Sequence, residues 1–189
     1  MKQAKTLKAD ELKVVLAHIA SRHHAARNRA IFLTSFLSGT RAHEIAALKL
    51  GDAVDDDGKI RDEIVLSAEQ TKGMHARRLF INIKLRKELA VYVKADCAGR
   101  LPSAPLFQTQ KRTSFNGNTM CQLFLTIYKN CGIKGASSHS GRRTFITNLA
   151  SKSVSVRVLA ALAGHRSIQT TQAYIEINDD QLRKAVELA

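Results

Sequence analysis

Cysteine is scarce in this chain of 189 residues, and its placement excludes two common kinds of stabilisation. Cys97, Cys121 and Cys131 are odd in number and widely spaced, and no Cys-x-x-Cys pair is present. A disulfide framework and a zinc site are therefore not expected, and free thiols suit a reducing compartment. We expect Cys121 and Cys131 to lie in the core.

Long hydrophobic runs are also absent. No apolar stretch approaches the roughly 18 to 20 residues that a membrane-spanning helix requires, and residues 1–10 are too polar for a signal peptide. The sequence therefore predicts a cytoplasmic protein that does not contact a membrane.

Acidic residues are few relative to basic ones. Thirty Lys and Arg against sixteen Asp and Glu give a formal net charge of +14, and the pI is near 10.1. The basic residues occur throughout segments that also carry apolar periodicity, which favours a folded basic surface over a disordered arm. This excess of positive charge predicts a polyanionic partner. The hydrophobic content of 44% is enough for the core of one globular domain.

Hydrophobic periodicity predicts a mainly helical protein with a small antiparallel sheet. Leu12, Val15, Leu16 and Ile19 follow the spacing of a helix with one buried face, over 9–20. By the same reasoning, and from capping residues, we expect further helices over 25–38, 41–48, 84–95, 116–130, 141–151, 155–163, 167–174 and 178–187. A turn signal at 55–58 precedes two short strands, 60–66 and 78–83, and the clearest loop, 99–105, holds both prolines.

Four segments concentrate residues that could act on a phosphate: SGTRAHE at 38–44, TKG at 71–73, HSGRRTF at 139–145 and LAGHRSIQTTQAY at 162–174. Arg41 and Glu44 are three residues apart, as are His139 and Arg142. The members of each pair therefore share a helix face and can converge. Backbone N–H groups at the start of the helix after His139 also suit a phosphate.

Together these segments resemble the tyrosine recombinase family, also called phage integrases. The similarity runs from about residue 6 to residue 177 and keeps the family's order and spacing. It implies the family's catalytic-domain fold and a reaction that cleaves and rejoins DNA through a 3′-phosphotyrosyl intermediate, without metal, ATP or other cofactor. Tyr174 would be the nucleophile, on a separate helix that can withdraw or be exchanged. Without its place after the Gly-His pair, Tyr174 would be interpreted as a half-buried packing residue, as we expect of Tyr92 and Tyr128.

The resemblance also implies how the phosphate would be held. The transition state of phosphoryl transfer carries extra negative charge on the non-bridging oxygens. Arg41 and Arg142 would grip these oxygens with planar, permanently charged guanidinium groups, and His165 would donate a further hydrogen bond. Glu44 would orient Arg41.

Proton transfer is the remaining requirement. A free tyrosine has a pKa of about 10, so its hydroxyl must be activated near neutral pH. The resemblance implies that His139 assists the proton of Tyr174 and that Lys72 protonates the departing 5′ oxygen as general acid. The basic residues close to Lys72 are alternatives for this role: Arg77, Arg78 and Lys84.

The sequence departs from the family pattern in two places. Gly141 and Arg143 occupy positions where a Leu and a His are common, and Gly141 should be less firmly held by packing than a Leu. No segment of 1–189 resembles the helical DNA-clamping domain that usually precedes the catalytic part, so we expect 1–189 to be a single catalytic domain.

The family resemblance predicts double-stranded DNA as the partner, with the protein associated with the nucleoid. Four protomers would assemble on a recombination junction, with a monomer or dimer in the absence of DNA. Within the final segment, 178–189, Leu182, Val186 and Leu188 form an apolar stripe that could dock on its own chain or be exchanged with a neighbour.

Two other functions remain open from the sequence. A type IB topoisomerase uses the same chemistry but rejoins the same strand. The sequences of the His-x-x-Arg and Gly-His segments are more similar to those of an integrase. A DNA-binding accessory protein that never cuts would carry the same basic charge, but it would have no reason to keep all six catalytic positions.

Overall fold

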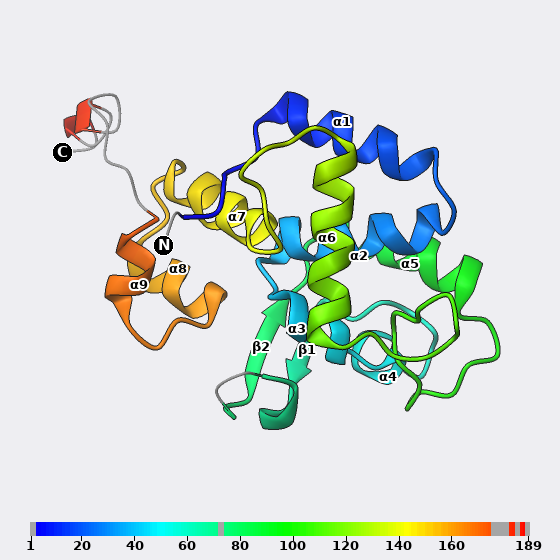
Figure 1. The fold of residues 1–189 in the computed structure, drawn as a ribbon. Helices are drawn as coiled ribbons and strands as arrows, with labels where there is room; N and C mark the ends of the chain where they lie inside the picture. The colour runs from blue at the N-terminus through cyan, green and yellow to red at the C-terminus, as the bar shows by residue number, and fades with distance from the viewer. Residues whose placement is uncertain (1–2, 72–73, 175–181, 184–185, 188–189) are drawn as a thin grey trace.

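The computed structural model describes residues 3–71, 74–174, 182–183 and 186–187. Within them, strands β1 (Glu63–Leu66) and β2 (Arg77–Phe80) pair antiparallel, with Glu63 opposite Phe80 and Leu66 opposite Arg77. The helices lie mostly above and to either side of this hairpin, which is at the lower edge of the molecule in Figure 1. They are α1 (Ala9–Ala20), α2 (Ala25–Ser38), α3 (Ala42–Ala47), α4 (Leu50–Ala53), the 3-10 turn η1 (Ala68–Gln70), α5 (Ile83–Asp96), α6 (Gly117–Asn130), α7 (Ser140–Ala150), α8 (Val156–Ala163) and α9 (Ile168–Gln172).

The predicted fold class, mainly helical with a small antiparallel sheet, is confirmed. Helices α1 and α2 have the predicted bounds, whereas α4 and η1 were not predicted. The first strand is shorter than predicted because Ile60 forms an isolated bridge with Val54 instead of extending β1. The helix predicted over 178–187 lies outside the described residues, apart from 182–183 and 186–187.

Helix α2 forms the centre of the hydrophobic core. Its Phe32 packs against Phe36, Phe124 and Tyr128, with ring centroids 6.1–6.4 Å apart. Tyr128 and Tyr92 are each only 1% exposed, so both are fully buried and not half-buried as predicted. Burial raises the pKa of both phenols.

The three cysteines are free thiols. Cys97 is buried within the core, whereas Cys121 and Cys131 are partly buried and pack against it. Within the described residues, no helix is long and apolar enough to cross a bilayer.

The buried apolar residues fall into two groups. The large cluster extends from Leu7 to Ile133 and includes residues of α1 to α6 and of both strands. A smaller group lies outside that cluster, on α7 and α8: Ile146, Ala150, Leu159, Ala160 and Ala163. We call 3–150 the main body and 155–174, which contains α8 and α9, the C-terminal lobe. The lobe lies at one side of the main body, next to β2 and α7 (Figure 1).

Candidate functional site

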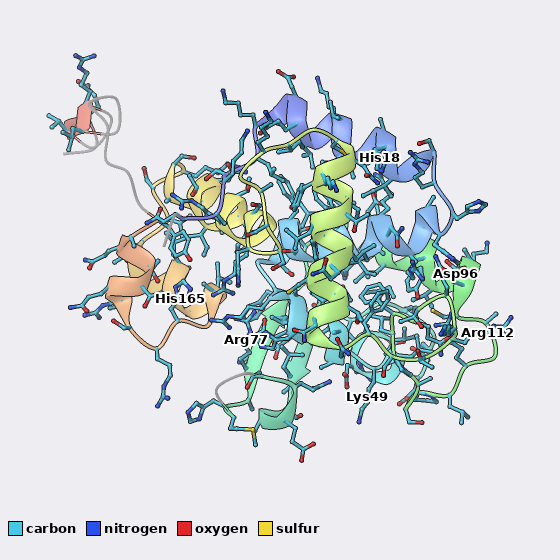
Figure 2. The ribbon with its side chains drawn as sticks, in the orientation of Figure 1. His18, Lys49, Arg77, Asp96, Arg112 and His165 are labelled. Atoms are coloured by element: carbon cyan, nitrogen blue, oxygen red, sulfur yellow. The ribbon has the colours of Figure 1, made fainter. Side chains whose placement is uncertain are left out.

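A pocket of about 670 Å³ lies between the main body and the C-terminal lobe. Figure 2 shows Arg77 and His165 on this side of the molecule, where β2 faces the lobe. Glu44 is the one acidic residue among the described residues that line the pocket. The described residues that line it are Arg41, Glu44, Thr71, His75, Ala76, Arg77, Gly164, His165, Arg166, Ser167 and Thr170.

Glu44 is fully buried at the first turn of α3, immediately behind the pocket. Its carboxylate accepts hydrogen bonds from the Arg41 backbone N–H at 2.8 Å and from Arg41 Nη1 at 2.9 Å. The spacing of three residues permits both, because Arg41 is the N-cap and Glu44 the third residue of α3. Oε2, the oxygen that accepts from the Arg41 backbone N–H, is also 3.4 Å from Arg77 Nη2. One buried carboxylate thus orients two guanidinium groups.

Arg77 is a site residue that the sequence interpretation named only as an alternative to Lys72. It lies on the inward face of β2, opposite Leu66, and its side chain is only 11% exposed. Nη1 donates to the Ala163 carbonyl at 2.5 Å, while Nε and Nη2 are buried without a hydrogen-bond partner among the described residues. Burial lowers the pKa of Arg77, and Glu44 opposes that shift. An arginine at a core-facing strand position was the signal that could have identified it.

Arg142 lies on α7 and is 4% exposed. Nη1 donates to the Gly39 carbonyl at 2.7 Å and Nη2 to the Ala163 carbonyl at 2.6 Å. Burial, together with the positive charges of Arg41 and Arg77, lowers the pKa of Arg142 to about 9. The group therefore remains a cation at neutral pH.

Two glycines allow α7 to approach α2 closely enough to place Arg142. A Cβ at Gly141 would lie 2.7 Å from Ser35 Oγ, and a Cβ at Gly39, where φ is +66°, would lie 2.6 Å from Phe145 Cδ1. The expectation that Gly141 is poorly held by packing was wrong, because its lack of a side chain is what permits the close contact.

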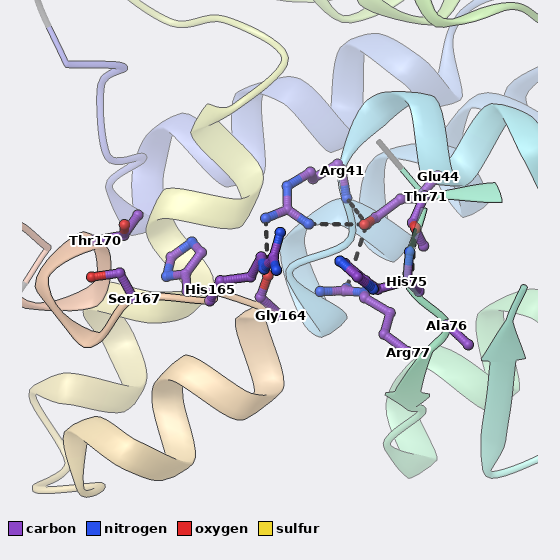
Figure 3. Close-up of a pocket in the computed structure, with 11 residues that line it drawn as sticks. Arg41, Glu44, Thr71, His75, Ala76, Arg77, Gly164, His165, Ser167 and Thr170 are labelled. Carbon is purple, nitrogen blue, oxygen red and sulfur yellow. Dashed lines mark hydrogen bonds and ion pairs between the residues drawn. The ribbon is translucent and has the colours of Figure 1, made fainter. Parts of the chain in front are cut away.

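The C-terminal end of α8 supplies the acceptors for all three arginines. The Ala163 carbonyl accepts from both Arg77 and Arg142. The Gly164 carbonyl accepts from Arg41 Nη2 at 3.2 Å (Figure 3). The last carbonyls of a helix lack partners within it and carry partial negative charge, so they suit guanidinium groups. Gly164 ends the helix with φ of +62°, and a Cβ there would run into the Arg77 guanidinium.

His165 follows this turn and lies beside Tyr174. Its Nδ1 is 2.8 Å from the hydroxyl of the fully buried Thr171. Burial, and then the charges of Arg142, Arg41 and Arg77, lower the pKa of His165 to about 4, so the imidazole is neutral at pH 7. Its ring stacks on Tyr174, with centroids 5.8 Å apart and planes inclined by 18°.

The structure brings together four of the predicted catalytic side chains with Glu44: Arg41, Arg142, His165 and Tyr174. His139 is the exposed N-cap of α7, three positions before Arg142. Lys72 lies outside the described residues. The described part of the chain contains no group of three or more His, Cys, Asp or Glu side chains that could bind a metal ion.

The arrangement can bind an anion. Three guanidinium groups, Arg41, Arg77 and Arg142, face one carboxylate, Glu44, which leaves positive charge unbalanced in a largely buried cluster. The neutral imidazole of His165 adjoins this cluster and stacks on the phenol ring of Tyr174. An imidazole N–H can donate a hydrogen bond and a phenol can act as a nucleophile, and both suit phosphoryl transfer.

Comparison with known proteins gives consistent matches. The model of the phage integrase family matches residues 5–181. Tyrosine recombinase XerA from Pyrococcus furiosus is 27% identical over 189 residues, covering 98% of this chain and 62% of the relative. The crystal structure of XerA recombinase has a TM-score of 0.77 at 24% identity, over 99% of this chain and 66% of that one.

A further solved structure is that of XerH site-specific recombinase bound to palindromic difH substrate, in a post-cleavage complex. Its TM-score is 0.74 at 21% identity, over 98% of this chain and 53% of that one. The chain spans 53–62% of the length of three curated recombinase relatives that it matches.

Proposed function

Because the chain belongs to the phage integrase family, we propose that it acts as the catalytic domain of a tyrosine-type site-specific recombinase. Such a domain cleaves and rejoins double-stranded DNA through a 3′-phosphotyrosyl intermediate. The observation that carries the proposal is the cluster of three arginines around buried Glu44, next to His165 and Tyr174. This cluster suits a phosphodiester, which is an anion that gains charge in the transition state.

The reaction would proceed by displacement at phosphorus. The Tyr174 hydroxyl oxygen attacks the scissile phosphorus and loses its proton, the bond to the 5′ oxygen breaks, and a 3′-phosphotyrosyl link forms. Arg41 and Arg142 neutralise the non-bridging oxygens. In the tautomer whose Nδ1 accepts the Thr171 hydroxyl proton, Nε2 of neutral His165 donates to one of those oxygens.

Three further residues would assist the leaving group, the nucleophile and the phosphate-binding arginines. Lys72 gives a proton to the departing 5′ oxygen, and His139 assists the proton of Tyr174. Glu44 orients Arg41 through the two hydrogen bonds described above. Rejoining is the reverse displacement, in which a 5′ hydroxyl attacks the phosphotyrosyl link. The link preserves the energy of the phosphodiester, so neither ATP nor a metal ion is required.

The relatives support the choice of partner, since XerH was solved with its difH substrate. We propose double-stranded DNA as the partner here and four protomers on a recombination junction, with a monomer or dimer when DNA is absent. Residues 1–189 would act as one catalytic domain, and residues 178–189 would dock on the same chain or be exchanged between protomers. Action on chromosomal DNA would place the protein at the nucleoid in the cytoplasm.

Capture of the covalent intermediate tests the proposal. A pool of nicked suicide duplexes with randomised arms, which lose the 5′ strand after cleavage, is incubated with the protein. Adducts that survive denaturant are isolated and their DNA is sequenced. We expect an adduct that Tyr174→Phe abolishes and that Tyr128→Phe, the matched control in the core, retains.

Failure to recover any adduct from the pool would contradict the proposal. Once a site has been recovered, strand exchange between two duplexes supports a recombinase. Relaxation of a supercoiled plasmid without exchange would instead indicate a topoisomerase.

A further inference from the structure

Arg143 lies against the phenol ring of Tyr174. Its guanidinium carbon is 5.6 Å from the ring centroid, within the range of a cation–π contact. Its Nε donates to the hydroxyl of Thr6 at 3.2 Å. Arg143 is also one of the two positions where the sequence departs from the family pattern. The contact with Tyr174 is therefore a feature of this chain's own sequence.

Residues 5–7, which include the Thr6 that holds Arg143, are themselves fixed to the rest of the main body. Leu7 N donates to the buried Thr144 hydroxyl at 2.9 Å, and Lys5 N donates to the Gly135 carbonyl at 3.1 Å. The Leu7 side chain is 5% exposed and belongs to the main hydrophobic cluster. Residues 5–7 are thus anchored on both sides of Thr6, which gives its hydroxyl a defined position.

Tyr174 needs such a contact because it lies two residues beyond Gln172, the last residue of α9. Its backbone N–H donates to the Thr171 carbonyl at 2.9 Å. The described ring contacts of Tyr174 are with His165 and Arg143, and Arg142 interacts with Tyr174 electrostatically. His165 belongs to the C-terminal lobe, whereas Arg143 belongs to the main body. Arg143 is therefore the described contact that fixes the ring relative to the main body.

We propose that Arg143 is a positioning residue for the nucleophile. Held by Thr6, it places the Tyr174 ring beside His165 and so connects residues 5–7 to the reactive hydroxyl. This inference rests on the proposed role of Tyr174 in DNA cleavage.

Fluorine NMR tests the contact without DNA. The chain has three tyrosines, so incorporation of 3-fluorotyrosine gives resonances for Tyr92, Tyr128 and Tyr174, assigned by single Tyr→Phe variants. We expect Arg143→Ala to move the Tyr174 resonance toward that of the unfolded protein and to leave the two buried tyrosines unchanged. Arg143→Lys should retain most of the wild-type shift.

Two further variants separate the contact from a loss of charge or of folding. Thr6→Val keeps Arg143 and the shape of residue 6 but removes the acceptor, so it should move the resonance in the same direction by a smaller amount. Arg157→Ala removes an exposed cation from α8 and should leave the resonance unchanged.

Single-turnover cleavage of the recovered duplex tests the consequence. At saturating DNA, Arg143→Ala should cleave about two- to fivefold more slowly, which is the rate equivalent of losing one cation–π contact. Arg143→Lys should restore most of the rate, and the DNA Kd should change little, as in Arg157→Ala.

The opposite pattern would overturn the inference. A large rise in Kd with an unchanged Tyr174 resonance would show that Arg143 contacts DNA phosphates instead. An unchanged resonance, rate and Kd would show that Arg143 has no role. If the wild-type protein forms no adduct, the proposed function fails, while the resonance still reports whether Arg143 positions Tyr174.

Discussion

The main body and the C-terminal lobe differ in what holds their helices in place. In the main body, α2, α5 and α6 bury a continuous cluster of aliphatic and aromatic side chains. The lobe shares a small apolar group with α7, and guanidinium groups of the main body reach the carbonyls at the end of α8. Apolar packing has little directional preference, whereas these hydrogen bonds fix direction and distance. The residues proposed to hold the phosphate therefore also orient the lobe.

The largest expected effect comes from removing the carboxylate on which this arrangement depends. Glu44→Gln leaves the largely buried Arg77 and the partly exposed Arg41 without a counter-charge, and we expect it to lower the free energy of unfolding by about 3–5 kcal/mol. Urea denaturation measures this change. Glu88→Gln breaks a comparable but partly exposed pair with Arg29 and should cost less than about 1 kcal/mol. Equal effects would show that burial of the cluster does not matter.

Arg77→Met tests whether charge anchors the lobe. The substitution keeps much of the side-chain volume but loses the hydrogen bond to Ala163, worth about 1.5–3 kcal/mol for a charged donor. Hydrogen exchange should accelerate in α8 and remain unchanged in α2. The control is Arg78→Met, because Arg78 lies on the outer face of β2 and pairs with Glu63. Equal exchange in the two variants would argue against the anchor.

Gly141→Ala tests the close approach of α7 to α2. Helix propensity alone would stabilise the variant by about 1 kcal/mol. We expect a loss of about 1–3 kcal/mol instead, because the new methyl group meets Ser35. Adding Ser35→Ala removes the nearest atom, an Oγ without a hydrogen-bond partner among the described residues, and should recover part of the loss. Thermal denaturation shows whether Gly141→Ala stabilises or destabilises the protein.

The lobe should also respond to acid through His165. Its pKa is lowered from about 6.5 to about 4 in the folded protein, so the unfolded chain binds the proton more readily. The stability present above pH 6.5 is therefore lost as the pH falls toward 4. We expect His165→Gln to weaken the dependence of Tm on pH across this window. Substitution of the exposed His23 by Gln is the control. An unchanged slope of Tm against pH in His165→Gln would show that the pKa of His165 is not lowered in the folded protein.

The smallest expected effects lie in the main body. Tyr92 donates to the Leu106 carbonyl at 2.8 Å, so Tyr92→Phe should cost about 1 kcal/mol. The Tyr128 hydroxyl is buried without a hydrogen-bond partner in the described part of the chain, so Tyr128→Phe should be neutral or slightly stabilising. Urea denaturation of both variants measures the difference. A loss in Tyr128→Phe as large as in Tyr92→Phe would show that the hydroxyl has a partner.

The sequence predicted the long helices well because their signals are local. The periodicity of α1 and the left-handed glycine after α2 lie within the segments that they define. The length of β1 could not be predicted in this way, since it depends on a bridge between Ile60 and Val54 that forms only in the folded chain.

In the candidate site too, features that depend on local sequence were predicted, and features that depend on the folded chain were not. The Arg41–Glu44 contact follows from a spacing of three residues and was predicted. The place of Arg77 depends on strand register, and the packing of Gly141 on Ser35 depends on how α7 crosses α2. Neither is a property of the neighbouring sequence. For this reason Arg77 was named only as an alternative to Lys72, and the expectation for the packing of Gly141 was wrong.

The carbonyl of Ala163 accepts hydrogen bonds from two arginines that come from different elements, β2 and α7. A displacement of the end of α8 would break both bonds in one movement, and Arg41 would lose its bond to the next carbonyl. The end of α8 is therefore a reference point shared by all three cations, while Glu44 also holds Arg41 and Arg77, and the Gly39 carbonyl also holds Arg142.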